Sequence, residues 1–139
     1  TWFRQMDSIF NVGTVDDLVA QLTDERKAFI GIWDEQLVAV VIVERHDNGC
    51  YEGHLMACDV SLEAVAAVGS QLIHDLLDID LNEAFVWIAE KNLGVRRLCS
   101  TIGFLPDGIV MYKGAYRGRV IKWLRYSIQR EQILMAQAA

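Results

Sequence analysis

Two side chains that could exchange protons with a substrate lie close together in the segment CYEGHLMAC, which spans residues 50–58. Glu52 and His54 are two positions apart, so both project from the same face if this segment is a β-strand. Histidine titrates near neutral pH, and His54 could therefore accept a proton from an attacking nucleophile. The favoured alternative is that both residues are ordinary polar side chains at an exposed end of the strand.

A third candidate is Cys99, which lies in the segment NLGVRRLCSTIGF at residues 92–104. The thiol of an unperturbed cysteine has a pKa of about 8.5, so Cys99 could donate a proton to a leaving group. It could also accept an acyl group as a nucleophile if a base or a helix end lowered its pKa. The alternative is a small buried residue one helical turn after Val95, and the usual burial of free cysteine favours it.

The composition predicts one globular domain. The chain has 139 residues, of which 53% are hydrophobic and 23% charged, and such a chain can build a core. No apolar run approaches the roughly 20 residues of a membrane span, and no signal peptide is visible. The odd number of cysteines, three, fits reduced thiols and a cytoplasmic location. No set of His, Cys and Asp has the spacing of zinc ligands, so the sequence predicts no metal.

The charges are divided unequally along the chain. The net charge of −6 argues against a general nucleic-acid binder. Residues 96–139, however, contain eight of the 13 Lys and Arg residues and two of the 19 acidic residues. Within them, the segment YRGRVIKWLRY at 116–126 could bind an acidic partner or a nucleic-acid backbone. The favoured alternative is a pair of strands whose long cationic side chains reach water.

Hydrophobic periodicity predicts the elements that would position these residues. Two helices are expected first, one over residues 2–10 and one after an N-cap at Thr14. Three antiparallel strands are expected next, separated by short polar turns, at residues 27–33, 36–44 and 50–58.

The second half of the chain alternates helices and strands. A helix is expected from an N-cap at Ser61, followed by a buried strand at 84–89 and a helix over 92–102 that Gly103 ends in a left-handed conformation. Two strands at 109–112 and 119–128 precede a tail, from Gln129, that is a short helical turn or frayed. The strand–helix–strand order predicts one parallel crossover in a mostly antiparallel sheet, and hence a single α/β (α+β) domain over 1–139.

This order of elements, together with three local matches, resembles the GCN5-related N-acetyltransferase (GNAT) superfamily. Asn92 follows the strand at 84–89, as an asparagine does in many members. The segment CSTIGF at 99–104 stands where many have Tyr-x-x-x-Gly-Phe, and VGSQLI at 68–73 resembles the helix after the pyrophosphate loop. The resemblance covers nearly the whole chain after the first helix. It implies a mixed, mostly antiparallel central sheet with helices on both faces, and a first family strand that is not visible and would precede Thr1.

The resemblance also implies an activity and the residues that would perform it. The activity is acyl-CoA-dependent N-acyl transfer, with acetyl-CoA as the donor and a small-molecule or peptide amine as the acceptor. Asn92 would bond the thioester arm from one side. The backbone groups that would pair with the arm from the other side belong to Met56, Ala57 and Cys58. The amides that would hold the pyrophosphate, at the start of the next helix, belong to Val68, Gly69 and Ser70.

The family's catalytic and acceptor positions can be transferred in the same way. Cys99 stands where many members have a tyrosine that protonates the leaving CoA thiolate. Glu52 and His54 lie on the strand that often supplies the base. Trp123 and Tyr126 lie in the last strands, which line the acceptor side in this fold, and would shape the acceptor pocket.

The pyrophosphate loop departs from the family pattern. Members have Arg/Gln-x-x-Gly-x-Gly or Ala, whereas the aligned residues here are AVAAVG at 64–69, so that only Gly69 matches. Alanine and valine can extend the helix back to Ser61, and amides inside a helix cannot hold an anion. The alternative function is therefore a GNAT-fold protein that has lost CoA binding and acts as an interaction or phage structural protein. A looser likeness to small bacteriophage GNAT-like proteins, in VWI at 86–88 and TIG at 101–103, belongs to this alternative. Apolar helix faces and the C-terminal segment could support a homodimer.

Overall fold

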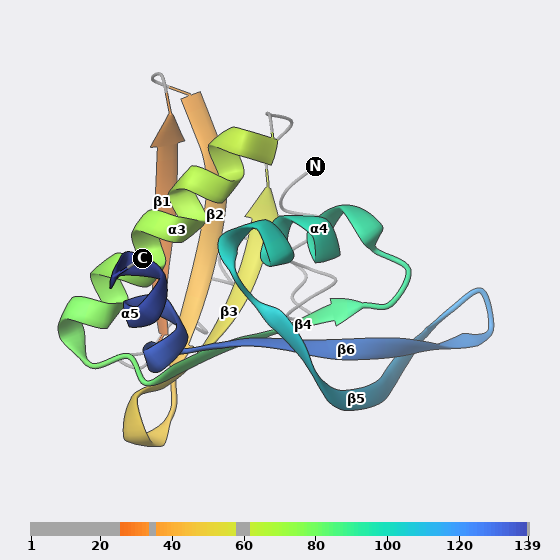
Figure 1. Cartoon of the computed structure of the whole chain (residues 1–139). Helices are drawn as coiled ribbons and strands as arrows, with labels where there is room; N and C mark the ends of the chain where they lie inside the picture. The colour runs from red at the N-terminus through yellow and green to blue at the C-terminus, as the bar shows by residue number, and fades with distance from the viewer. Residues whose placement is uncertain (1–25, 34–35, 58–61, 139) are drawn as a thin grey trace.

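The computed structural model describes residues 26–33, 36–57 and 62–138, which form one sheet with helices packed against it (Figure 1). The sheet has six strands in the order β1-β2-β3-β4-β6-β5. Its strands are β1 (Arg26–Trp33), β2 (Gln36–Arg45), β3 (Cys50–Ala57), β4 (Glu83–Ala89), β5 (Leu105–Tyr116) and β6 (Arg119–Gln129). The helices are α3 (Leu62–Ile79), α4 (Leu93–Ile102) and α5 (Arg130–Ala138), with a short 3-10 turn at Asp47–Gly49. The two helices expected near the N-terminus lie outside the described residues.

Strand pairing confirms the predicted crossover. The first three strands pair antiparallel in succession, and β3 then pairs parallel with β4. The connection between β3 and β4 contains α3, as a parallel pair requires. The last two strands add antiparallel pairs, β4 with β6 and β6 with β5.

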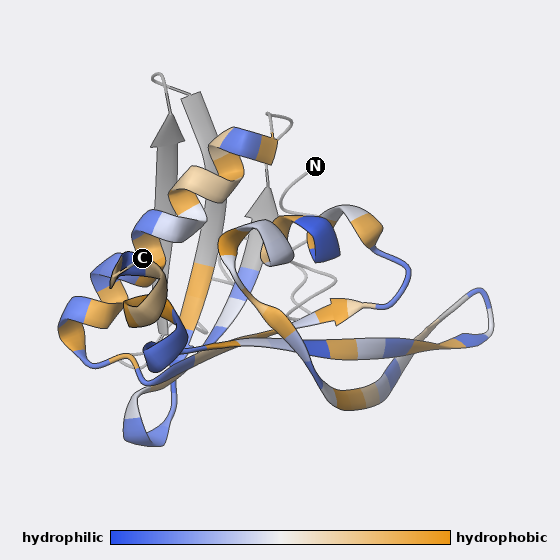
Figure 2. Cartoon of the chain, viewed as in Figure 1, coloured by the Kyte–Doolittle hydropathy of each residue, from blue (hydrophilic) through white to orange (hydrophobic). Residues whose placement is uncertain are grey.

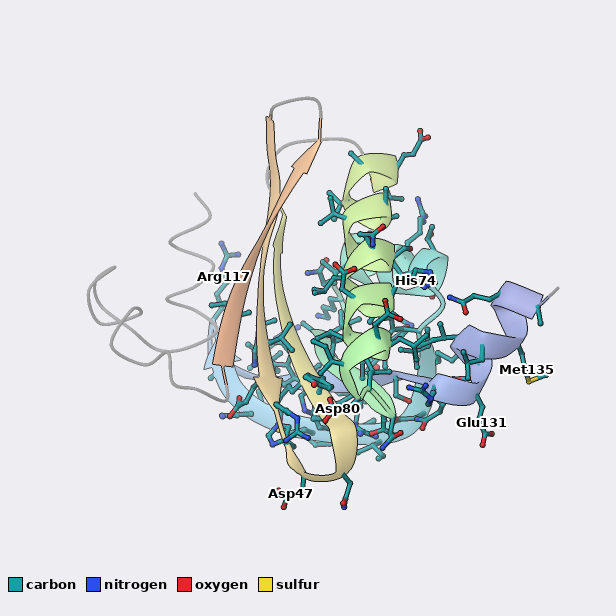
Figure 3. All side chains as sticks on the ribbon, turned by 90° about the vertical axis from the view of Figure 1, so that its left-hand side faces the viewer. Asp47, His74, Asp80, Arg117, Glu131 and Met135 are labelled. Atoms are coloured by element: carbon teal, nitrogen blue, oxygen red, sulfur yellow. The ribbon has the colours of Figure 1, made fainter. Side chains whose placement is uncertain are left out.

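The two faces of the sheet carry different side chains because successive residues of a strand point to opposite faces. One face is apolar, and it packs under α3, α4 and α5, which lie together on one side of the sheet in Figure 3. Tyr51, Ala84 and Ile88 belong to this face, each 6% exposed or less. The opposite face at the same strands carries Glu52 and Phe85, which are direct register partners.

The helix α4 begins and ends as its sequence predicts. Asn92 is its N-cap, with a side-chain oxygen that accepts a hydrogen bond from the Val95 amide at 3.2 Å. Gly103 adopts φ 118° at the C-terminal end, a conformation that favours glycine. The amide of Phe104 then donates to the Cys99 carbonyl at 2.9 Å, and its ring is buried.

Two C-terminal elements are longer than predicted. The strand β5 extends beyond residues 109–112 in both directions, with register shifts between Pro106 and Val110 and between Tyr112 and Ala115. Such shifts are typical of β-bulges, which let a strand continue where the sequence interrupts the alternation of hydrophobic and hydrophilic residues. Figure 2 shows that alternation of hydrophobic and hydrophilic residues along the β5–β6 hairpin.

The C-terminal tail, expected as a short helical turn or frayed, is a nine-residue helix. One buried side chain, Ile133, anchors α5 in the core cluster. The guanidinium of Arg130 donates to the carbonyls of Leu77 and Leu81 at 3.2 and 3.1 Å, near the end of α3. A single apolar contact and a set of long-range hydrogen bonds therefore hold a segment whose own periodicity is weak.

Candidate functional site

The parallel strands β3 and β4 are paired along only part of their length. Their register pairs are limited to Cys50–Glu83, Tyr51–Ala84 and Glu52–Phe85. Beyond these pairs β3 stays with β2 as far as Ala57, and β4 stays with β6 as far as Ala89. In Figure 1 the two strands visibly diverge, with β3 running upward and β4 to the right. Within the described residues, no ladder joins 53–57 to 86–89.

The divergence begins at Gly53. A Cβ atom at this position would lie 3.2 Å from Cγ1 of Val86, which is a tight contact. The two strands are therefore still in close contact one residue after the last paired position. Met56 and Ala57, two of the residues expected to bond a thioester arm, lie farther along the diverging part of β3. The third, Cys58, lies outside the described residues.

Two helices begin beyond the carboxyl ends of these strands. The first described residue of α3 is Leu62, and α4 starts at Leu93 directly after its cap, Asn92. Unpaired amides and the helix dipole make such ends favourable for anions. Glu63 in the first turn of α3 opposes this effect with a negative charge. Capping occupies the side-chain oxygen of Asn92.

The residues that the sequence aligns with the pyrophosphate loop lie inside α3. Val68, Gly69 and Ser70 follow Leu62 by more than one turn, where helix amides donate to carbonyls of the preceding turn. Gly69 marks a close approach between helices instead, because a Cβ atom there would lie 2.6 Å from Cδ1 of Ile102. The expectation that these three amides hold a pyrophosphate stays a prediction, and their place inside the helix argues against it.

Cys99 lies in the main hydrophobic core cluster and is 5% exposed. Burial raises the pKa of its thiol to about 12, because a thiolate is poorly stabilised in apolar surroundings. Transfer of a proton from a thiol with such a pKa to an ordinary thiolate costs free energy, because the ordinary thiol is the stronger acid. At neutral pH such a thiol is hardly ever ionised, so it is a poor nucleophile. The structure therefore favours the interpretation of Cys99 as a small buried residue.

Glu52 and His54 lie together on the face of β3 that points away from the helices. The Nε2 atom of His54 is 3.7 Å from Oε2 of Glu52, and Nε2 of His46 is 3.1 Å from Oε1. The carboxylate therefore stands between two imidazoles. His46 also stacks on Phe85 with ring centroids 6.0 Å apart. Glu44 of β2 is the direct register partner of Glu52 and completes this cluster.

A second polar group ties β4, β5 and β6 together next to this cluster. The guanidinium of Arg125 donates to Glu83 and to Asp107, both at 2.6 Å, and it lies 4.3 Å from the centroid of the Phe85 ring. The side-chain amide of Gln129 donates to the other oxygen of Glu83 at 2.6 Å. Partial burial alone would raise the pKa of Glu83, but the hydrogen bonds from Gln129 and Arg125 hold it below its usual value.

The two residues expected at the acceptor pocket lie on opposite faces of β6. Trp123 pairs with Ala89, on the same face as the Glu52 cluster, and its indole N–H donates to the Lys113 carbonyl at 3.0 Å. Tyr126 points the other way and is 4% exposed, with its hydroxyl accepting from Nε of Arg96 at 3.1 Å. Only Trp123 is therefore positioned to contact a ligand of that face.

Sequence reasoning missed Glu44, His46 and Phe85, which surround Glu52 and His54. They come from β2, the turn after it and β4, and only the register of three strands brings them together. The signal that could have found two of them is a repeated pattern, ERH at 44–46 and EGH at 52–54.

None of the described helices is long and apolar enough to span a membrane.

Comparison with known proteins gives matches in structure but not in sequence. No family model matches the chain, and no curated protein sequence does. A spermidine N-acetyltransferase from Vibrio cholerae, solved in complex with CoA and spermine, is similar with a TM-score of 0.72 and 14% identity, over 88% of this chain and 79% of that one. A probable acetyltransferase from Staphylococcus epidermidis is similar with a TM-score of 0.71 and 12% identity, over 86% and 79%. At such identities the likeness concerns the fold.

Proposed function

We propose that this chain, which has the GNAT fold, is a diverged acyl-CoA-dependent N-acyltransferase that moves an acetyl group to an amine. The observation that carries the proposal is the divergence of β3 and β4 after Glu52 and Phe85. A gap between parallel strands offers unpaired backbone donors and acceptors at its two edges, and a pantetheine arm carries amides that need such partners. The solved structures with this fold include one whose protein binds CoA.

The arm would lie between the strands and enter from their carboxyl ends. Backbone groups of Met56 and Ala57, with Cys58, would pair with it along β3. The NH2 group of Asn92 would donate to it from the β4 side, where the Asn92 amide already donates to the Ala89 carbonyl at 2.9 Å. The pyrophosphate would then reach the first turn of α3, which begins at Leu62, rather than residues 68–70.

The transfer itself needs a base but no buried acid. The amine nitrogen attacks the thioester carbonyl carbon, the carbon–nitrogen bond forms, the carbon–sulfur bond breaks, and CoA leaves as a thiolate. Glu52, directly or through His54, would accept the proton that the amine loses. Water would protonate the thiolate, and we leave Cys99 out of the catalytic groups. The carboxylates of Glu44 and Glu52 would also favour a cationic amine at this face.

Affinity for acetyl-CoA should be weak, because the described residues around the first turn of α3 supply little positive charge. Glu63 repels phosphate there, while Arg96 is held by the Glu90 carbonyl at 2.8 Å and by Tyr126. We expect a Kd of about 0.1–1 mM, or about 4–5.5 kcal/mol of binding free energy.

Calorimetry with acetyl-CoA, in a buffer that contains a chelator, tests the proposal. The Glu63→Gln variant should bind more tightly because it removes a negative charge from the helix N-terminus. The Asn92→Ala variant should bind more weakly, and the exposed Glu131→Gln variant serves as the matched control. Release of free thiol with a set of amines then measures transfer. Absence of heat at millimolar acetyl-CoA, with the protein folded, would end the proposal.

The second candidate is a GNAT-fold protein without CoA chemistry that acts through contacts with other proteins, as in a phage particle. Two observations favour it: α3 runs through the loop positions, and Cys99 is buried. Its contact surface would be the β5–β6 hairpin, where Val110, Tyr112 and Val120 are 45%, 65% and 65% exposed. The same calorimetry separates the two candidates, because only the first requires acetyl-CoA to bind.

A further inference from the structure

We propose that Glu44, Glu52 and His54, with His46 as a fourth ligand, form a binding site for a divalent transition-metal cation of the zinc type. The site lies on the polar face of β2 and β3, beside the point where β3 leaves β4. It reverses the expectation of no metal that sequence spacing gave. The proposal does not depend on acyl transfer.

The distances suit one ion. The ligand atoms of Glu44, Glu52 and His54 all lie within 4.8 Å of one another. The Glu52 carboxylate is 3.7 Å from Nε2 of His54 and 3.1 Å from Nε2 of His46. Ligand atoms bound at about 2.0–2.2 Å to a tetrahedral zinc ion lie about 3.2–3.6 Å apart. Side-chain movements of about 1 Å would therefore close Glu44, Glu52 and His54 around a cation. His46 contacts the other oxygen of Glu52 and would have to move farther to become the fourth ligand.

The strand geometry explains why the four residues converge. The chain contains the pattern Glu-x-His twice, as ERH at 44–46 and EGH at 52–54. Alternation puts each histidine on the same face as the glutamate two residues before it, and His46 keeps an extended backbone with φ −104° and ψ −177°. The antiparallel register then sets Glu44 directly opposite Glu52. The two carboxylates therefore lie side by side, with His54 on one side of them and His46 on the other.

The electrostatics and the ligand types point in the same direction. Like charges directly opposite each other on neighbouring strands destabilise a sheet. A divalent cation between Glu44 and Glu52 would attract both carboxylates. A mixed set of imidazole and carboxylate ligands is one that zinc and its neighbours in the first transition row accept, whereas calcium and magnesium prefer oxygen alone. A bound cation would occupy the lone pairs of Glu52 and His54, so their proposed use as a base belongs to the metal-free chain.

The test uses the untagged full chain, stripped of metal by a chelator that is then removed. Titration with ZnCl2 in a calorimeter should give one site per chain with a Kd in the micromolar range. The Glu44→Gln and His46→Ala variants should each weaken binding at least about tenfold, which is about 1.4 kcal/mol. The matched controls His74→Ala and Glu131→Gln remove an imidazole and a carboxylate outside the cluster, and both should bind zinc as the parent chain does.

Substitution by Co²⁺ provides the second readout, since its visible spectrum reports the ligands. We expect d–d bands without a thiolate charge-transfer band. Such a thiolate band would place the metal on cysteine and overturn the proposal. So would the absence of zinc binding up to 1 mM, or equal affinity in the parent chain and both cluster variants. Should Glu44→Gln fail to fold by circular dichroism, His46→Ala decides alone, because the His46 side chain is 43% exposed and its loss leaves the core intact.

Discussion

The two faces of β3 and β4 differ in what lies against them. On the helix side, Leu98 of α4 packs with Ala64 and Val65 of α3, and Gly69 lets Ile102 approach closely. On the other side, the carboxylate of Glu52 stands between two imidazoles next to the diverging strands. The first region is apolar and closed, and the second is polar and half-buried.

The difference teaches where a family motif can mislead. The best local matches to the GNAT family, at residues 68–73 and 99–104, fall in the closed region. There the same residues are explained by helix packing, by a left-handed glycine cap and by a buried thiol. The polar region has no continuous motif, yet it has the groups that can move a proton. Residues that match a motif can therefore be explained by core packing alone, and the match by itself does not establish the chemistry.

The largest expected effect is on the closed region. Leu98 is 3% exposed between α3 and α4, so Leu98→Ala should lower the free energy of unfolding by about 2–5 kcal/mol through lost burial and a cavity. Leu93→Ala, at a side chain 64% exposed on the same helix, is the matched control and should change it by about 0.5 kcal/mol or less. Urea unfolding measures both. Equal losses in the two variants would mean that the helix pair is not closely packed.

The polar region is tested by activity rather than by stability. If Glu52 receives the proton of the amine, Glu52→Gln should lower the turnover of acetyl transfer by about 100-fold, which is about 2.7 kcal/mol. Its affinity for acetyl-CoA should stay within twofold of the parent value. Thiol release and calorimetry measure the two quantities, with Glu131→Gln as the control. Unchanged turnover would remove Glu52 from the mechanism and leave the metal proposal standing.

Cys99→Ala compares the regions directly, because the family resemblance gives Cys99 a catalytic role and the structure gives it a packing role. We expect a loss of about 1 kcal/mol in the free energy of unfolding, since one buried sulfur is removed. Turnover should change less than twofold. Since burial raises the pKa of the thiol to about 12, alkylation of Cys99 in the folded chain at pH 8 should be slow. A tenfold loss of turnover in a folded variant would return Cys99 to the catalytic groups.

Most of the described fold could be predicted because its elements carry strong periodic signals. The strands β1, β2, β3, β4 and β6 and the helix α4 begin and end within about two residues of the expected positions, and α3 begins directly after the expected N-cap at Ser61. The errors lie where tertiary contacts outweigh local pattern. Bulges carry β5 past the breaks at Gly108 and Gly114, which adopt positive φ. Contacts of Ile133 and Arg130 order a tail that has no clear apolar face.

The candidate site could be predicted only in part, for a related reason. Glu52 and His54 are neighbours on one strand, so strand alternation alone places them together. Glu44 joins them through the register between β2 and β3, and a sequence does not state its register. The structure argues against the assignment of residues 68–70 to a pyrophosphate site, because alanine and valine continue a helix through positions where the family has a loop.

A pH measurement separates the polar region from the closed one. Glu83 sits where β3 and β4 are still paired, held by Arg125 and Gln129, and its pKa is lowered from an unfolded value near 4.5. The stabilisation from the charged form is therefore complete above pH 4.5 and is lost as the pH falls through the lower folded pKa. Unfolding free energies should fall less steeply with acid in Glu83→Gln than in the parent. If the unfolding free energies of the parent and of Glu83→Gln fell in parallel below pH 4.5, the charged Glu83 carboxylate would not stabilise the paired strands.

The smallest expected effect is that of Gly69→Ala, and it tests directly whether residues 68–70 pack a helix or bind a phosphate. Alanine at position 69 gains about 0.5–1 kcal/mol of helix propensity over glycine. Its Cβ atom would lie 2.6 Å from Cδ1 and 3.5 Å from Cγ1 of Ile102, and both atoms belong to one flexible side chain that can rotate away. The two effects oppose each other, so Gly69→Ala should leave the free energy of unfolding within about 1 kcal/mol and acetyl-CoA affinity within twofold. A phosphate loop at 68–70 would require the opposite result, because added bulk there would block the close approach of an anion to the amides. Weaker acetyl-CoA binding by Gly69→Ala, with no loss in the free energy of unfolding, would therefore place Gly69 in the acetyl-CoA site. It would also show that the amides of residues 68–70 leave their helical hydrogen bonds when acetyl-CoA binds.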